Sequence, residues 1–303
     1  MPSIEVAEIN RKNAELAREL YMKGRSPSGG ATDWRESLRQ ARGLIADALR
    51  SSEYMRDPAG ALVKSGSHMT AFRHLMAPPM SQDQFKLVCP AWSKGSEKKG
   101  RVSPVNAKAV AESVLEWIDR ASVPWLGSNR SPTRAELRQT LQRVSALIAQ
   151  QKVQTVQRNR LSNIQESAVV NLLLSMGWEK RPSTLIRVAA AVPSETFMHK
   201  TKFATATRPA EVDVACGLGG TIVAAIECKV TNDETNSIKR INDVVKKAEA
   251  WQRHWGSFMK TVAVLQGVIA PKEVDRLSDA HVHVFWSHDL PALEAWLRGE
   301  LQP

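Results

Sequence analysis

The chain has 303 residues, and 43% of them are hydrophobic, which is enough for one large domain or two ordinary ones. Three cysteines with no CxxC pair exclude a disulfide framework, and no apolar run approaches the roughly 20 residues of a transmembrane helix. The formal net charge of +11 points to a polyanionic partner, most simply nucleic acid. Because the N-terminus also lacks the apolar core of a signal peptide, we expect a cytoplasmic protein with no membrane partner.

The positive charge is concentrated in the first half of the chain. Residues 1–155 hold 24 lysines and arginines against 15 acidic residues, a net of +9, whereas residues 156–303 hold 18 against 16, a net of +2. We therefore predict a basic nucleic-acid-binding region over residues 1–155 and a second domain over residues 156–303. A basic protein without a nucleic-acid partner is the alternative.

The first half is mainly helical by pattern. The predicted helices cover residues 4–22, 33–51, 106–121 and 132–151. The predicted breaks are a Gly/Ser/Pro-rich loop at residues 24–32, Pro78-Pro79, and a basic loop at residues 93–104. Within the basic loop, Lys98, Lys99 and Arg101 could clamp DNA, although such charge clusters are usually only solvated.

The second half alternates helices and strands. A helix at residues 161–176 is followed by a β-hairpin at 211–230, a helix at 237–255, a strand at 261–270, a short helix at 271–279, a strand at 281–286 and a closing helix at 290–301. Two strands of one sheet that are joined through a helix lie parallel. The order therefore predicts an α/β sandwich.

The hairpin carries the most informative residues. Residues 211–216 alternate between apolar and polar, and residues 222–230 form an almost wholly apolar run that is typical of a buried strand. The glycines between the two runs favour a tight turn. Glu227 and Lys229 lie on one face of the second strand, and the hairpin brings Asp213 across to Glu227. Two carboxylates and a lysine are thus predicted to converge on a core sheet.

This convergence has a chemical interpretation. Ionised groups in a buried strand are costly unless they are paired or bind a metal. Two carboxylates can hold Mg²⁺, and Lys229 can position an attacking water or stabilise the negative charge that develops on a phosphate. The alternative is a buried ion pair between Glu227 and Lys229, with Asp213 exposed to solvent.

At these residues the chain resembles the PD-(D/E)xK nuclease superfamily. Asp213 matches the first acid, Glu227 the second acid, and Lys229 the lysine. Val212 stands where the pattern has proline, a departure that many members share. The longer run over residues 209–236 also resembles the XamI family of type II restriction endonucleases.

The resemblance, which covers residues 160–290, implies a restriction-endonuclease-like core, in which helices flank a mixed sheet, after a mainly helical N-terminal region. It implies that residues 1–155 are a basic helical DNA-binding and specificity region. It also implies that residues 156–303 are a PD-(D/E)xK catalytic domain that uses Mg²⁺ to cut double-stranded DNA at a specific site. The resemblance also implies a homodimer that recognises a palindromic DNA site, and GTCGAC is the first site to test. It further implies a cognate DNA methyltransferase that protects the same site in the host.

Further candidate residues surround the hairpin. In many members of the superfamily a glutamate on the preceding helix reaches the metal, and Glu166 holds that place here, with an exposed helix glutamate as the alternative. The basic candidates for phosphate contact are Lys200, Lys202 and Arg208, with a solvated loop as the alternative. The candidates for DNA contact in the segment that follows the Lys229 strand are Thr231, Asn232, Asn236, Lys239 and Arg240. For this segment, simple capping of the next helix by Thr235 or Asn236 is the alternative.

Two rival functions share these features. A structure-specific DNA repair or junction-resolving nuclease would have the same core, and a non-catalytic DNA-binding subunit would have a degenerate one. The intact trio of Asp213, Glu227 and Lys229 argues against degeneracy. His281 and His283 lie on one strand face, but no third ligand accompanies them, so a metal site there is not expected.

Overall fold

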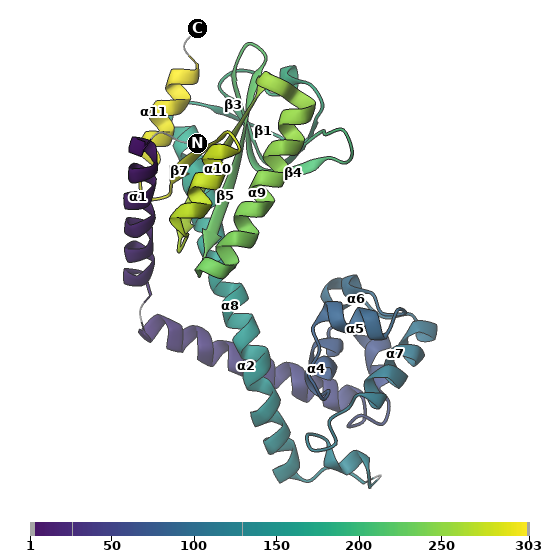
Figure 1. Ribbon diagram of the computed structural model, residues 1–303. Coiled ribbons are helices and arrows are strands. Elements are labelled where there is room, and N and C mark those ends of the chain that lie inside the picture. Colours follow the sequence, from purple (N-terminus) through teal and green to yellow (C-terminus); the bar gives the residue numbers. More distant parts are fainter. Residues whose placement is uncertain (1–3, 26, 129, 302–303) are drawn as a thin grey trace. The chain divides into compact units, whose positions relative to one another are not determined.

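The structure, a computed structural model, describes residues 4–25, 27–128 and 130–301, apart from the side chains of residues 4, 5 and 99. The chain forms two compact units: a sheet unit of residues 1–26 and 157–303, and a helical unit of residues 27–156 (Figure 1). The predicted boundary after residue 155 lies one residue from the observed one. Residues 1–26 differ from the prediction because they belong with the sheet unit.

The helical unit is built around one apolar core. Its elements are α2 (Pro27–Ser51), α3 (Pro58–Lys64), α4 (His68–His74), α5 (Gln82–Val88), α6 (Lys94–Lys99), α7 (Pro104–Glu116), η1 (Pro124–Leu126) and the first part of α8 (Arg134–Ser175). Trp92 and Trp125 are buried in this core, so neither is available to stack on a base. The unit carries 19 lysines and arginines against 11 acidic residues, a net of +8.

Several helices of this unit differ from the prediction, and the physical reason is clear for α2, α6 and α8. α2 begins at Pro27, because the fixed φ of proline suits the first turn of a helix, and most of the predicted loop at residues 24–32 is therefore helical. α6 lies inside the predicted basic loop, where Glu97 anchors it through a buried ion pair with Arg73. α8 is one continuous helix, because residues 152–160 contain neither glycine nor proline to end it.

The sheet unit contains a mixed seven-stranded sheet. Its strands are β1 (Glu179–Arg181), β2 (Leu185–Ile186), β3 (Thr196–Phe203), β4 (Ala210–Gly219), β5 (Ile222–Thr231), β6 (Met259–Gly267) and β7 (Val282–Trp286). The strand order is β1-β3-β4-β5-β6-β7, with β2 beside β3. β3, β4 and β5 are antiparallel neighbours, whereas β5, β6 and β7 are parallel. The predicted hairpin and the predicted parallel strands are both present.

Helices cover both faces of this sheet, which confirms the predicted fold class. The helical elements of the unit are α1 (Ile4–Lys23), the second part of α8, η2 (Ala189–Ala191), α9 (Glu234–Trp255), η3 (Gly256–Phe258), α10 (Pro271–Asp279) and α11 (Leu290–Glu300). α8 and α11 pack against one face, and α1, α9 and α10 pack against the other (Figure 1). Cys228 faces α8, while Glu227 and Lys229 face α9, because successive strand residues point to opposite faces.

Two further expectations concern the whole chain. The three cysteines, Cys89, Cys216 and Cys228, are buried free thiols, which agrees with the absence of a predicted disulfide framework. Over the residues that the structure describes, no helix is both long and apolar enough to span a bilayer.

Candidate active site

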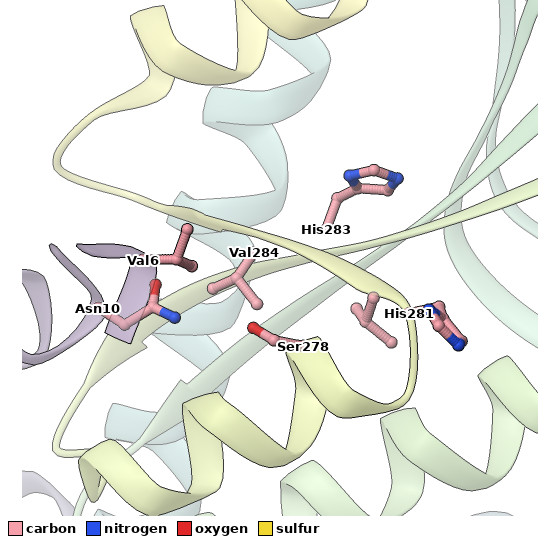
Figure 2. Close-up of a pocket in the computed structure, with 7 residues that line it drawn as sticks. Val6, Asn10, Ser278, His281, His283 and Val284 are labelled. Atoms are coloured by element: carbon pink, nitrogen blue, oxygen red, sulfur yellow. The ribbon is translucent and has the colours of Figure 1, made fainter. Parts of the chain in front are cut away.

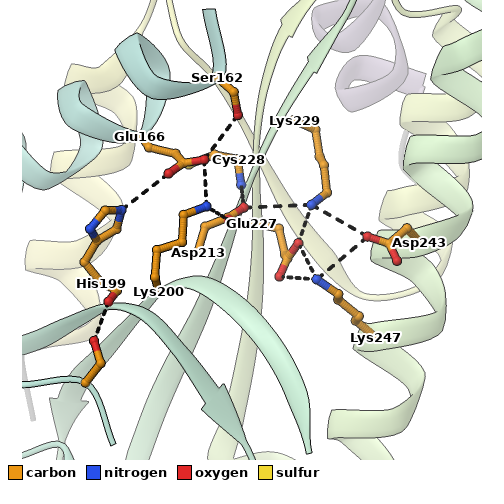
Figure 3. A network of polar contacts seen from close by, with 11 residues as sticks. Ser162, Glu166, His199, Lys200, Asp213, Glu227, Cys228, Lys229, Asp243 and Lys247 are labelled. Atoms are coloured by element: carbon orange, nitrogen blue, oxygen red, sulfur yellow. Dashed lines mark hydrogen bonds and ion pairs between the residues drawn. The ribbon is translucent and has the colours of Figure 1, made fainter. Parts of the chain in front are cut away.

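The hairpin of β4 and β5 brings the three predicted catalytic residues together (Figure 3). The antiparallel register places Asp213 beside Glu227. The Lys229 ammonium lies 2.5 Å from Glu227 Oε2 and 3.8 Å from Asp213 Oδ2. The main-chain N–H of Cys228 donates to Asp213 Oδ2 at 2.9 Å, which fixes that carboxylate against the neighbouring strand.

Two residues of α9 extend the site, and the sequence did not indicate either of them. Lys247 Nζ donates to both carboxylate oxygens of Glu227, at 2.9 Å and 3.0 Å. Asp243 Oδ2 lies 3.7 Å from the ammonium groups of both Lys229 and Lys247. Asp243 and Lys247 are four residues apart, so they lie on the same face of α9 and reach the site together.

Glu166 reaches the site from α8 through a lysine. Its side chain is buried, so the alternative of an exposed helix glutamate is wrong. Glu166 Oε1 accepts hydrogen bonds from Lys200 Nζ at 2.8 Å and from Ser162 Oγ at 3.1 Å. Lys200 Nζ also donates to Asp213 Oδ1 at 2.7 Å. His199 Nε2 lies 3.4 Å from the other oxygen of Glu166 (Figure 3).

Lys200 has a backbone conformation that is unusual for its residue type. Its φ is 55°, in the left-handed region, where a residue with a side chain is disfavoured by roughly 1–2 kcal/mol. Strained residues of this kind cluster at functional sites. We predicted that Lys200 contacts a phosphate, and the structure instead joins it to the carboxylates of Glu166 and Asp213.

The charges of the site stabilise one another. Burial alone would raise the pKa of Asp213, but the charge of Lys229 and the hydrogen bonds from Lys200 and the Cys228 amide hold that pKa below its ordinary value. Burial alone would lower the pKa of Lys229, but Glu227 and Asp213 hold it above its ordinary value. Glu227 has 0% of its side chain exposed, and this burial raises its pKa despite the two ammonium groups beside it.

The donor set of Asp213 and Glu227 fits a hard divalent cation. Both residues turn a carboxylate oxygen toward the same Lys229 ammonium, and carboxylate oxygens are the ligands that Mg²⁺ prefers. Among the described residues, no three acidic, histidine or cysteine side chains form a ready-made cage. Mg²⁺ does not need one, because it usually takes one or two carboxylates together with waters and substrate phosphates. The alternative with a solvent-exposed Asp213 is wrong, since only 16% of that side chain is exposed.

Comparison with known proteins identifies the family. The sequence model of the XamI restriction endonucleases matches residues 40–286, which include every residue of the site described above. The chain belongs to the XamI restriction endonuclease family. It is therefore a type II restriction endonuclease, a hydrolase that acts as a site-specific deoxyribonuclease, and the predicted family resemblance is confirmed.

Two known proteins are similar to this chain. The chain is 32% identical over 190 residues to the type II restriction enzyme XamI of Xanthomonas campestris pv. amaranthicola, a match that covers 62% of this chain and 67% of that enzyme. Among solved structures, protein VC1899 from Vibrio cholerae aligns with 91% of this chain and 58% of its own length. The TM-score of that alignment is 0.32 and the sequence identity is 12%.

Three residues that were predicted to contact DNA lie on the protein surface near the candidate active site. Lys202 is exposed and pairs with Glu211 at 3.2 Å. Arg208 is exposed in the loop before β4. Asn236 is exposed, and its side-chain amide donates to Asp233, which caps α9 in place of the predicted Thr235 or Asn236. Lys202, Arg208 and Asn236 are accessible to a ligand, and their contact with DNA stays a prediction.

The predicted DNA contact of Thr231 is not compatible with the structure. The Thr231 side chain is buried, and its hydroxyl donates to the carbonyl oxygen of Val268 at 2.7 Å. This bond ties the end of β5 to the chain after β6. Asn232 is only partly exposed, and its side-chain oxygen accepts a hydrogen bond from the Tyr21 hydroxyl of α1 at 3.0 Å.

The remaining predicted contacts are basic. Lys239 is exposed and Arg240 is partly exposed on α9, and neither forms an ion pair within the described part of the chain. Lys98 on α6 and Arg101 just after it are exposed on the helical unit. The side chain of Lys99 lies outside the described residues.

The two histidines near β7 lie in different surroundings. His283 packs its ring against Trp296, with ring centroids 4.8 Å apart. His281 precedes β7 in a left-handed conformation, and Figure 2 shows the two imidazoles at separate places around a cavity of about 400 Å³. Neither ring belongs to a cluster of three candidate ligands among the described residues.

Proposed function

We propose that the chain is a Mg²⁺-dependent endonuclease that hydrolyses both strands of double-stranded DNA at a specific sequence. The observation that carries this proposal is the meeting of Asp213, Glu227 and Lys229 at one hairpin of a XamI-family protein. Two hard ligands beside a protonated lysine suit the hydrolysis of a phosphodiester, in which negative charge develops on the attacked phosphate.

The three central residues have distinct roles in this mechanism. Asp213 and Glu227 would hold the metal through their carboxylate oxygens, and the bound ion supplies a polarised phosphodiester and a more acidic water. Lys229 keeps its proton at neutral pH, since its pKa is raised. Its N–H groups can therefore donate to the attacking water and to the phosphate oxygens as these become more negative.

The neighbouring residues position this trio. Lys247 holds both oxygens of Glu227, which restricts the orientation of that carboxylate. Asp243 balances the charges of Lys229 and Lys247 on the α9 side. On the α8 side, Lys200 links Asp213 to Glu166, so Glu166 acts on the site through a lysine. Three elements of the sheet unit thus fix the trio.

The wider assembly follows from the same proposal. A two-fold symmetric homodimer would place one such site on each strand of a palindromic duplex. GTCGAC is the first site to test, and a methyltransferase that modifies the same site would protect the host DNA. A cytoplasmic location stays a prediction.

The decisive experiment compares Asp213→Asn and Glu227→Gln with a matched control, Glu211→Gln. Glu211 lies on β4 two residues from Asp213, but its side chain is exposed and pairs only with Lys202 among the contacts described. With Mg²⁺ and plasmid DNA, the two site variants should lose at least about a hundredfold in cleavage rate, or about 2.7 kcal/mol in barrier. The control should cleave like the wild type, and all three should still bind DNA.

The outcomes also separate the rival functions. Discrete fragments from a DNA of known sequence support a restriction endonuclease. Nicks confined to branched or mismatched duplexes would indicate a repair or junction-resolving enzyme, and retardation of DNA without any cleavage would indicate a non-catalytic subunit. A site variant that keeps more than about a tenth of the wild-type rate, a loss below ~1.4 kcal/mol, would remove that residue from the catalytic set.

A further inference from the structure

We propose that a cavity in the helical unit binds a backbone phosphate of the DNA duplex. The cavity has a volume of about 690 Å³ and lies where the end of α3 meets α6 and the segment that follows it. Lys64, Ser65, Ser67, Lys98 and Arg101 line it. The inference deepens the proposed function, because it assumes that duplex DNA is the substrate.

The walls of the cavity are joined by main-chain hydrogen bonds. The N–H of Gly66 donates to the carbonyl of Gly100 at 2.8 Å, and the N–H of Val102 donates to the carbonyl of Leu62 at 3.2 Å. A Cβ atom at Gly66 would lie 2.2 Å from the carbonyl oxygen of Ser96, so only glycine permits this approach. The basic residues therefore project from two segments that are held at a fixed separation.

Three cations at the cavity have no partner within the described part of the chain. Lys64, Lys98 and Arg101 are exposed and form no ion pair there. Three further exposed cations of the same unit are paired, namely Arg39 with Glu36, Lys94 with Asp83, and Arg130 with Glu136, and they can serve as controls. The cavity thus gathers positive charge that the protein itself leaves uncompensated, in a unit whose net charge is +8.

The acidic residue that also lines the cavity does not cancel this charge. Glu97 is buried, and its carboxylate accepts two hydrogen bonds from the guanidinium of Arg73, at 2.6 Å and 3.2 Å. The Thr70 hydroxyl donates to the same carboxylate at 2.6 Å. Because the buried Arg73 guanidinium balances the charge of Glu97, the net charge that faces the cavity is that of Lys64, Lys98 and Arg101.

The remaining groups at the cavity suit a phosphate. The hydroxyls of Ser65 and Ser67 lie 2.7 Å apart, and one of them can turn its O–H toward a ligand while accepting from the other. Lysine, arginine and serine side chains are the usual partners of backbone phosphates in DNA complexes. Such contacts set the register of a protein on the duplex without reading bases, so we assign the cavity to positioning.

A pair of triple variants tests this inference. One variant removes the cavity cations (Lys64→Ala, Lys98→Ala, Arg101→Ala), and the matched control removes three paired cations of the same unit (Arg39→Ala, Lys94→Ala, Arg130→Ala). Both lower the net charge by three, so they change long-range attraction alike. Binding to a duplex of arbitrary sequence is measured at several salt concentrations with a chelator present. Because each neutralised phosphate contributes about 0.9 to the slope of log K against log salt, loss of the phosphate at the cavity should flatten that slope by about 0.9 in the cavity variant and not in the control.

The outcomes separate failure of the cavity from failure of the function. A full-length wild type that does not bind any duplex would overturn the proposed function itself. Suppose instead that the wild type shows a steep slope. If both triple variants then reduce that slope equally, or if the cavity variant leaves it unchanged, only the assignment of the cavity to phosphate binding would be refuted. If the triple variant does not fold, the single variant Lys98→Gln serves instead, and it should flatten the slope by up to about 0.9. Inorganic phosphate that binds the wild type without weakening duplex binding would assign the cavity to a small anion instead.

Discussion

The substitution Lys200→Ala should tighten the binding of Mg²⁺ in the absence of DNA. The Lys200 ammonium donates to Asp213 Oδ1 at 2.7 Å and to Glu166 Oε1 at 2.8 Å. A cation that binds at Asp213 competes with this ammonium for the same oxygens. Removing the lysine removes the competitor and one unit of positive charge beside the metal.

The size of the effect follows from the contacts and from the exposure of the lysine. Removing a hydrogen bond to a charged group changes a free energy by about 1.5–3 kcal/mol when it is buried. The Lys200 side chain is 53% exposed, so solvent reduces each of its two ion pairs to about 0.5–1 kcal/mol. Only the pair with Asp213 competes with a metal at that carboxylate, so the gain is about 0.5–1 kcal/mol and the dissociation constant of Mg²⁺ should fall by roughly 2- to 5-fold.

Calorimetric titration of Mg²⁺ into the folded protein measures this change directly. The matched control is Lys202→Ala, which removes the same charge from the same strand but breaks only the exposed pair with Glu211. The affinity of the control should change by less than about twofold, as expected for an exposed pair. Unchanged or weaker Mg²⁺ binding in Lys200→Ala would refute the competition and would show that Lys200 instead prepares Asp213 and Glu166 for the metal.

Two further predictions separate catalysis from structure. Lys229→Ala should lose at least about a hundredfold in cleavage rate but should still bind Mg²⁺, because a protonated lysine has no electron pair to offer a metal; loss of Mg²⁺ binding by the folded variant would give Lys229 a structural role. Thr231→Val should lower the free energy of unfolding by about 0.5–1.5 kcal/mol, since the partly buried Val268 carbonyl loses its hydroxyl donor, and should leave DNA affinity unchanged. Weaker DNA binding at unchanged stability would instead restore the predicted DNA contact of Thr231.

The central trio was predictable because local patterns are sufficient to place it. Strand alternation puts Glu227 and Lys229 on one face, and the glycines at the turn pair β4 with β5, so Asp213 has to lie beside Glu227. Lys247 and Asp243 were not predictable in this way. Their helix was predicted. However, packing between elements that are distant in the sequence determines which face of α9 contacts the sheet and where along β5 each α9 residue lies.

Lys200 and Thr231 show the same limit from two directions. From the sequence, Lys200 was predicted to be a basic loop residue, because no clear pattern marks β3. Its left-handed φ cannot be inferred from the residue type or from the neighbouring residues. Thr231 reads as the start of a polar loop, but its hydroxyl is buried by the chain that follows β6. In both cases the partner that decides the role is more than ten residues away in the sequence.

By itself, the sequence determined the α/β class, the order of the second-half elements, the basic character of the first half and the convergence of Asp213, Glu227 and Lys229. These features depend on periodicity, composition and a tight turn, which act over a few residues. Only the tertiary structure decided that α1 belongs to the sheet unit, that Lys200 and Lys247 hold the carboxylates of Asp213 and Glu227, and that Lys64 joins Lys98 and Arg101 at one cavity. Such contacts join residues distant in the chain, and their geometry is set by how whole helices and strands pack, which no local pattern records.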